Sequence, residues 1–229
     1  MKSLLAFTGI FFCLQAPAQE NSDRDSAVYY RHQGQNARAL PFAKRHFEAV
    51  QNISNKDSVY ISAANYLAGI YNSLGNYDSA LIYDLKASEG AKKRYGATSI
   101  LYGNYVLNVV ETEMSGGLLE KAGQTYQNVK IIFDNPDSAY YKTAYYKRAY
   151  TRYLNGYAIF HLSTGELNEA EELYLRVCKM ALRDPVDSSA WIGALGGLAK
   201  VYQKMGFYAK QEAITLQILK FYKNKYGEE

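Results

Sequence analysis

The sequence predicts an all-α protein built from about five stacked helix-turn-helix units, and three observations support this fold class. Glycines recur at nearly constant spacings of 41, 42, 48 and 41 residues. The residues around these glycines match from copy to copy, and no segment shows the polar and apolar alternation of a strand. A period of this length is typical of helical solenoids, in which each unit covers the apolar face of its neighbour. The turn glycines are Gly34, Gly75, Gly117, Gly165 and Gly206.

Residues of similar size recur on both sides of each turn glycine, as expected for an apolar stripe at helical spacing. A small residue five positions after the glycine lets two helices cross closely, and an aromatic residue eight or nine positions after it fills the remaining gap. The small residues are Ala39, Ala80, Ala122 and Ala170, with Gln211 as the exception, and the aromatic residues are Phe42, Tyr83, Tyr126 and Tyr174. Four positions before the glycine the copies carry Tyr30, Tyr71, Glu113, His161 and Tyr202.

Helix boundaries are predicted by capping residues. Four Asp-Ser pairs precede helical runs, where a side-chain oxygen can accept hydrogen bonds from first-turn amides. They are Asp25-Ser26, Asp57-Ser58, Asp137-Ser138 and Asp187-Ser188. Basic residues before Gly96 and Gly227 are typical of helix ends. The predicted units are 21–54, 57–96, 98–135, 137–185 and 187–229, and we expect the longest interval to add two helical turns within 137–160.

The N-terminus has the layout of a secretory signal peptide. A basic Lys2 is followed by a short apolar run and by a small-x-small site ending at Ala18. We therefore predict a signal peptide over 1–18, a mature helical-repeat domain over 19–229, and an exported, periplasmic or secreted protein. Lipid attachment at Cys13 is disfavoured because Phe12 stands where a lipoprotein signal has a small residue. No apolar run reaches the length of a membrane span, so we expect no membrane insertion.

The composition favours binding over catalysis. The net charge of +4 comes from interspersed acids and bases, which predicts no nucleic-acid surface. The 23 tyrosines need a core or a binding surface to occupy. The three histidines lie outside metal-ligand spacings, and Cys178 fits a small core residue better than a nucleophile. We predict no catalytic residue, no metal site and no cofactor.

These repeats resemble the tetratricopeptide repeat (TPR) family. The longer period and the tetrads "NYLA", "LNVV", "NGYA" and "GGLA" look like the kinesin-light-chain type, which is also common in bacterial proteins with a caspase-like CHAT protease domain. The resemblance implies a right-handed α-solenoid whose first helices line a concave face that binds a peptide or protein. Asparagines of the tetrad would hydrogen-bond the partner's backbone, and residues one turn further along would face the same side. The implied binding residues are Asn65, Asn72, Asn108, Glu111, Asn155, Lys200 and Lys204. The alternative is that these are solvent-exposed polar residues of the helices with no role in binding.

The last predicted repeat leaves alternatives open. The register requires a further first helix after Gly227, and without it the outer face of Val201, Ile214 and Ile218 would be bare. One hypothesis is an exported binding scaffold that is complete without a catalytic part. A second is the sensing or recruiting N-terminal module of a larger protein, such as a periplasmic sensor kinase or a CHAT-type protease. A third is an oligomer that stacks end to end through this face.

Overall fold

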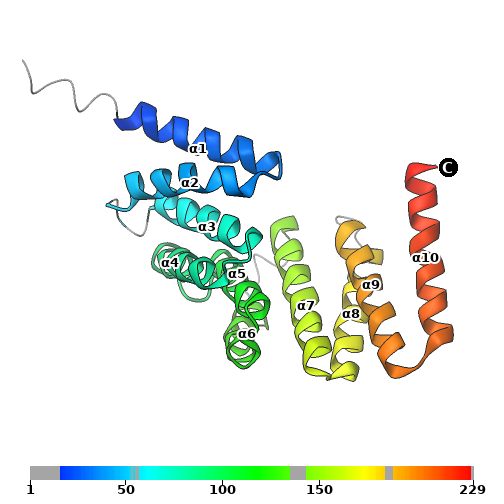
Figure 1. Cartoon of the computed structure of the whole chain (residues 1–229). Helices are drawn as coiled ribbons and strands as arrows, with labels where there is room; N and C mark the ends of the chain where they lie inside the picture. The colour runs from blue at the N-terminus through cyan, green and yellow to red at the C-terminus, as the bar shows by residue number, and fades with distance from the viewer. Residues whose placement is uncertain (1–15, 53, 55–56, 135–142, 184–187, 228–229) are drawn as a thin grey trace, which may run out of the picture. The chain divides into compact units, whose positions relative to one another are not determined.

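The computed structural model describes residues 16–52, 54, 57–134, 143–183 and 188–227. Within these ranges the chain forms ten helices and no strand, and successive helices pair as hairpins (Figure 1). The predicted all-α fold of stacked helix-turn-helix units is therefore confirmed. The hairpins are α1 (Ala16–His32) with α2 (Asn36–Val50), α3 (Ser58–Ser73) with α4 (Tyr77–Tyr95), α5 (Ile100–Ser115) with α6 (Leu119–Asp134), α7 (Ala144–Thr164) with α8 (Leu167–Arg183), and α9 (Ser188–Met205) with α10 (Tyr208–Tyr226).

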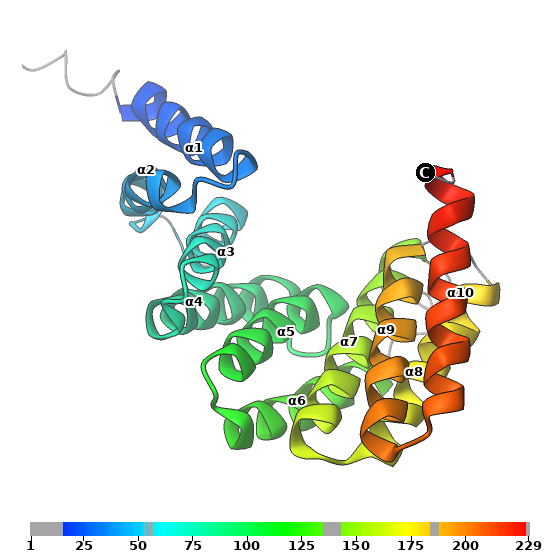
Figure 2. The ribbon, with the colours of Figure 1, turned by 45° about the vertical axis from the view of Figure 1, so that its right-hand side comes forward.

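The chain divides into two compact units, Met1–Ala97 and Thr98–Glu229. The first unit contains α1 to α4, where α2 packs against both α1 and α3. The second contains α5 to α10, and α7, α8, α9 and α10 follow one another as packed neighbours in both views (Figures 1 and 2). In the second unit the first helices α5, α7 and α9 also contact one another in that order.

The turns have the geometry predicted from their glycines. All five turn glycines have φ between +70° and +87°, a region that a side chain strains, and Gly96 and Gly227 have φ of +89° and +86°. The four alanines that follow the turns are completely buried at the helix crossings. A small residue at this position therefore lets the two helices of a hairpin approach closely.

Side-chain caps begin α3, α4, α5 and α7, although the predicted caps are not all present. The Asp57 carboxylate accepts from the Val59 amide at 2.7 Å, as predicted. The expected cap at Asp25-Ser26 is wrong, because both residues lie inside α1, whose proline, Pro17, stands in the first turn where a helix tolerates it. The pair Asp137-Ser138 and Asp187 lie outside the described residues. Thr143 instead caps α7, with its hydroxyl accepting from the Tyr146 amide.

Helix α7 contains part of the longest repeat interval. It has 21 residues, whereas α3 and α5 have 16 each. The predicted lengthening of this helix therefore amounts to more than one turn.

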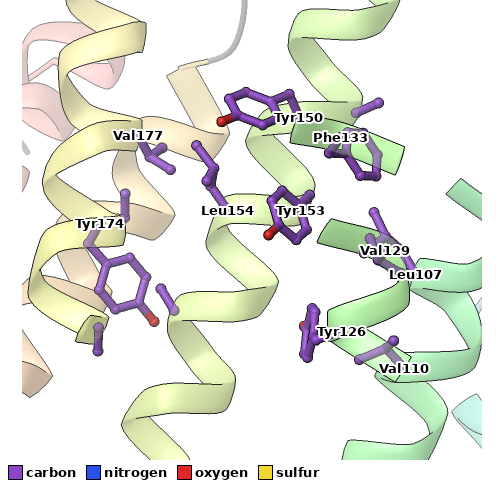
Figure 3. Packing of buried hydrophobic residues seen from close by; sticks show 14 of the residues in the cluster. Leu107, Val110, Tyr126, Val129, Phe133, Tyr150, Tyr153, Leu154, Tyr174 and Val177 are labelled. Atoms are coloured by element: carbon purple, nitrogen blue, oxygen red, sulfur yellow. The ribbon is translucent and has the colours of Figure 1, made fainter. Parts of the chain in front are cut away.

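The core of the second unit is built largely from aromatic side chains (Figure 3). Phe133 of α6 stacks on Tyr153 of α7 with ring centroids 5.0 Å apart and nearly parallel planes. Tyr126 and Tyr174 are buried against glycines of the next first helix, so that a β-carbon on Gly156 would lie 2.7 Å from the Tyr126 hydroxyl. Burial raises the pKa of Tyr174 to about 12, as expected for a phenol in apolar surroundings. The recurrent tyrosines thus serve as core residues here.

Glu113 departs from the repeat pattern, and the expected bare face at Val201 needs correction. Glu113, which replaces the usual tyrosine, is 1% exposed, and its Oε1 atom lies 3.4 Å from Nζ of Lys121. A carboxylate is thus accommodated in the core through an ion pair from the start of α6. Val201 is completely buried, so it does not belong to a bare outer face, and Ile214 and Ile218 pack partly against the core.

None of the described helices combines the length and the hydrophobicity that a membrane crossing requires. Residues 1–15 of the predicted signal peptide lie outside the described residues, and α1 begins at Ala16, two residues before the predicted cleavage point.

Candidate partner-binding face

Polar residues, together with Ile159 and two glycines, line one side of the first helices of the second unit. Residues three, four and seven apart share a face of a helix, so each helix contributes one stripe. We call these stripes together the first-helix face. They consist of Asn104, Asn108 and Glu111 on α5, of Arg148, Arg152, Asn155 and Ile159 on α7, and of Gly193, Gly196, Lys200 and Lys204 on α9.

Arg152 is the centre of the polar network on this face. Its guanidinium donates from Nε to Glu111 Oε1 at 2.9 Å and from Nη1 to the Asn104 carbonyl at 3.3 Å. Nη2 donates to Asn108 Oδ1 and lies 2.8 Å from Glu111 Oε1. The rigid fork of donors therefore joins α7 to three positions of α5. The Arg152 side chain remains 37% exposed and that of Glu111 49% exposed, so this network is accessible from the solvent.

Neighbouring tyrosines extend the network. The Asn104 amide donates to the hydroxyl of Tyr145, an exposed residue at the start of α7. Between α6 and α7, the Gln127 amide donates to the Tyr157 hydroxyl at 3.0 Å. Hydrogen bonds between side chains thus join α7 to both α5 and α6.

Asn155 connects α7 to α9. Its amide donates to the Ala190 carbonyl at a long distance of 3.4 Å, and its Oδ1 atom is buried without a hydrogen-bond partner among the described residues. The unpaired oxygen carries a desolvation cost that a better-paired amide would avoid. Through its bond to Ala190, Asn155 links the stripe of α7 to helix α9.

Lys200 and Lys204 are exposed on α9, and neither forms an ion pair with a residue in the described ranges. Lys200 and Glu111 each stand six residues before their turn glycine, so the two occupy equivalent positions of the repeat. The second unit thus carries Asn108, Glu111, Asn155, Lys200 and Lys204 of the predicted set.

Asn65 and Asn72 lie on α3 in the first unit, where both are half-buried and take part in polar interactions. The neighbouring Tyr66 hydroxyl donates to the Ala27 carbonyl, and the Arg31 guanidinium lies 4.7 Å from the Tyr66 ring centroid. Asn108 stands one position later in its repeat than Asn65, because the buried Leu107 occupies the equivalent position. The predicted ladder of asparagines is therefore not regular.

The sequence reasoning missed Arg152 and Asn104. Asn104 lies four residues before Asn108 on the same helix face, and this spacing was a usable signal. Arg152 could have been suspected because it stands one turn before Asn155 in a helix that has no carboxylate of its own. Its partners on α5 become visible only when the two helices are packed together.

Other chemically capable groups lie apart from this face. His161 Nδ1 hydrogen-bonds Glu166 Oε2 at the α7–α8 turn, and this bond together with one from Thr164 lowers the pKa of Glu166. Burial raises the pKa of the Cys178 thiol to about 11, which disfavours the nucleophilic thiolate. No three His, Cys, Asp or Glu side chains in the described part of the chain gather as a metal site.

Comparisons with known proteins agree with the fold. A sequence model of the tetratricopeptide repeat matches residues 61–100. No curated protein sequence matches the chain. One similar structure is a variant of a Podosopora anserina protein classed as a kinesin light chain, whose TPR-like repeats are nearly identical to one another. It superposes with a TM-score of 0.72 at 15% identity, covering 93% of this chain and 98% of that chain. BtubC (BKLC) from P. vanneervenii gives a TM-score of 0.69 at 15% identity, covering 94% of this chain and 91% of that chain.

A third similar structure contains a bound peptide. The Rap conjugation gene regulator of plasmid pLS20, solved in complex with the Phr* peptide, gives a TM-score of 0.69 at 14% identity, covering 97% of this chain and 60% of that chain. Hairpins of this kind define a helical-repeat scaffold. Residues 61–100 are a tetratricopeptide repeat, and the chain has the fold of kinesin-light-chain-like TPR proteins, as the tetrads predicted.

Proposed function

We propose that this protein is a non-catalytic scaffold that binds a peptide or protein segment on the first-helix face of the second unit. The observation that carries the proposal is the Arg152 network, which holds Asn108 and Glu111 in fixed positions while remaining partly exposed. Polar groups that are already ordered lose less conformational entropy when a partner binds. The accessible donors and acceptors of this face can therefore recognise a partner at a modest entropic cost.

Two further facts support this function. Tyr153 and Tyr174, which could otherwise offer a recognition surface, are buried in the core and leave binding to the polar stripes. The pLS20 Rap regulator, which has a similar fold, was solved with a peptide bound. This similarity concerns the fold, so it supports the class of ligand and not its identity.

The test is capture of the partner from an extract of the native host, with wild-type protein and two single variants compared by quantitative mass spectrometry. Arg152→Gln should reduce capture at least about fivefold, because it removes the group that orders the network. Lys179→Gln on α8 removes an exposed charge outside the face and should leave capture unchanged. Equal capture by Arg152→Gln and wild type, with circular dichroism spectra alike, would remove the assignment of this face.

A second candidate function follows from another structural match. A signal-transduction ATPase of the STAND class from Pyrococcus horikoshii has a tetratricopeptide repeat sensor, and this chain covers 29% of it with a TM-score of 0.67 at 16% identity. In that protein the repeats belong to a much longer chain. The equivalent proposal here is a recruiting module that precedes a sensor kinase or CHAT-type protease part. Sequencing the gene beyond the Glu229 codon decides it, since an immediate stop codon contradicts this candidate.

We also propose export through the predicted signal peptide. N-terminal sequencing of the native product should then find Gln19 as the first residue. A product that retains Lys2 and the apolar run after it would contradict the proposal.

A further inference from the structure

The charges on α7 and α9, which carry two of the three stripes of the first-helix face, are strongly unequal in sign. Helices α7 and α9 contain five lysine and arginine residues and no aspartate or glutamate. The second helices beside them, α6 and α8, balance their acidic and basic residues. The lysines and arginines of α7 and α9 are Lys147, Arg148, Arg152, Lys200 and Lys204.

The helix dipole favours Lys204 in the last turn of α9, but it does not explain the basic residues at the start of α7. Lys147 and Arg148 lie near the N-terminus of α7, where the helix dipole favours anions. Arg148 and Lys200 are exposed and form no ion pair with any residue that the structure describes. Arg152 pairs with the Glu111 carboxylate on α5. Arg148, Lys200 and Lys204 therefore form a basic stripe across α7 and α9 that has no carboxylate partner among the described residues.

Two glycines in the interior of α9 lie on this stripe. A β-carbon added to Gly193 or Gly196 would meet no atom within 4 Å, whereas one added to Gly197 would meet the Tyr174 ring at 2.2 Å. Packing thus accounts for Gly197 but not for the other two. Glycine in a helix interior costs up to about 1 kcal/mol relative to alanine. What these two positions provide is an α9 backbone that another chain can approach closely.

We infer that the partner is an acidic protein segment in extended conformation, lying against Gly193 and Gly196 with its carboxylates on Arg148, Lys200 and Lys204. This inference rests on the proposed function and specifies its ligand. From Gly193 to Lys204 the α9 stripe runs about 16 Å, which matches about five residues of extended chain. The Asn155 carboxamide, which donates a long hydrogen bond to the Ala190 carbonyl, lies beside this path.

A random dodecapeptide library, displayed and selected on the full-length protein, tests this ligand class. Aspartate and glutamate should be enriched among the selected peptides, and the enrichment should disappear when the selection uses the triple variant Arg148→Gln, Lys200→Gln and Lys204→Gln. The matched control is Lys220→Gln, Lys223→Gln and Lys225→Gln, which removes three exposed charges from α10. Selected peptides without enriched acidic residues would overturn the inference and leave peptide binding intact, whereas a library that yields no binder would count against the proposed function itself.

The most enriched peptide then serves as a labelled probe for fluorescence anisotropy. Changing its acidic residues to amides, or raising NaCl from about 50 mM to about 500 mM, should weaken binding at least about tenfold. A single-stranded dodecanucleotide should bind more weakly than this peptide. An oligonucleotide that binds as tightly and is lost with the same triple variant would overturn the choice of a protein ligand.

Gly196→Ala tests the approach to α9 separately. It should raise the thermal midpoint, because alanine is the better helix former and meets no neighbour. The same change should weaken the probe at least about fivefold, because the new methyl group keeps the bound chain away from α9. A more stable variant with unchanged affinity would remove Gly196 from the binding site.

Discussion

Tyr174 and Gly197 together fill one volume between α8 and α9. The tyrosine is 2% exposed, and its ring occupies the space where a β-carbon of Gly197 would stand. Tyr126 and Gly156 repeat this arrangement between α6 and α7. A protein interior packs closely enough that one methyl group at such a position forces a neighbour to move. The match of a large residue on a second helix with a glycine on the next first helix therefore fixes how two hairpins stack.

Gly197→Ala should destabilise the protein by about 2 kcal/mol, since overpacking outweighs the better helix propensity of alanine. Gly193→Ala on the same helix should instead stabilise it by about 0.5 to 1 kcal/mol, because no atom lies near the added carbon. Urea unfolding of both variants measures the difference. Equal effects at the two positions would show that the Tyr174 ring does not restrict Gly197.

Cys178 gives a prediction about pH. Burial raises its pKa from 9.0 to about 11, so the thiol loses its proton in the unfolded chain before it does in the folded one. Its contribution to stability is therefore complete below pH 9 and is lost as the pH rises toward 11. At pH 8 iodoacetamide should modify the folded protein about a hundredfold more slowly than the urea-unfolded chain, as the thiolate fractions require. Comparable rates, followed by intact mass, would contradict the burial of this thiol.

Some packing residues could be predicted from sequence and others could not. The alanines after four of the five turns were predictable because they recur at one position of the repeat, and all four are buried. The glycines opposite Tyr126 and Tyr174 were not linked to them, because each contact joins residues that are far apart in sequence and lie on different hairpins. The ion pair between Glu113 and Lys121 could likewise not be predicted from the sequence.

At the scale of the element, helix ends were more predictable than helix starts. Gly96 and Gly227 end α4 and α10 with positive φ, which glycine alone adopts without strain. Asp57 and Asp25 have the same local sequence, Asp-Ser, yet only Asp57 caps a helix. The difference lies in the preceding residues, because α1 already runs through Asp25 from Ala16. A capping residue therefore predicts a helix start only where the chain before it leaves the helical conformation.

Asp57→Ala should lower the free energy of unfolding by about 1 kcal/mol, because the Val59 amide loses its acceptor. Asp25→Ala is the matched control, since this exposed residue lies inside α1 and should change stability by less than about 0.5 kcal/mol. Both values come from chemical denaturation at neutral pH. A larger effect at Asp25 than at Asp57 would contradict the assigned helix boundaries.

The whole molecule consists of two compact units that meet in sequence between Ala97 and Thr98. Gly96 ends α4 at this point, and the Ser99 side chain caps α5 by accepting from the Tyr102 amide. Repeat proteins derive their stability from contacts between adjacent repeats. The fragment 98–229 should therefore fold alone, with a helical circular dichroism spectrum and a cooperative thermal transition. A spectrum without the helical double minimum would contradict the independence of the second unit.

The candidate site was predictable only in part. Asn108, Glu111 and Asn155 lie on the first helices of one unit and share a face, as the repeat register predicts. Asn65 and Asn72 belong to the other unit, which a linear register cannot reveal. Arg152 was missed because its role depends on partners 41 and 44 residues away on α5. Repetition thus predicted the helices that carry the site, and packing between helices determined its central residue.

The most direct test of the account is photo-crosslinking from the first-helix face in the native host. A photoreactive amino acid at Ile159, which is 48% exposed beside Asn155, should form a covalent adduct with the partner. The same amino acid at Leu175 on α8, which is 47% exposed, should not. Adducts from position 159 alone are the predicted result. Adducts from position 175 alone, or equal yields from both positions, would contradict binding on the first-helix face.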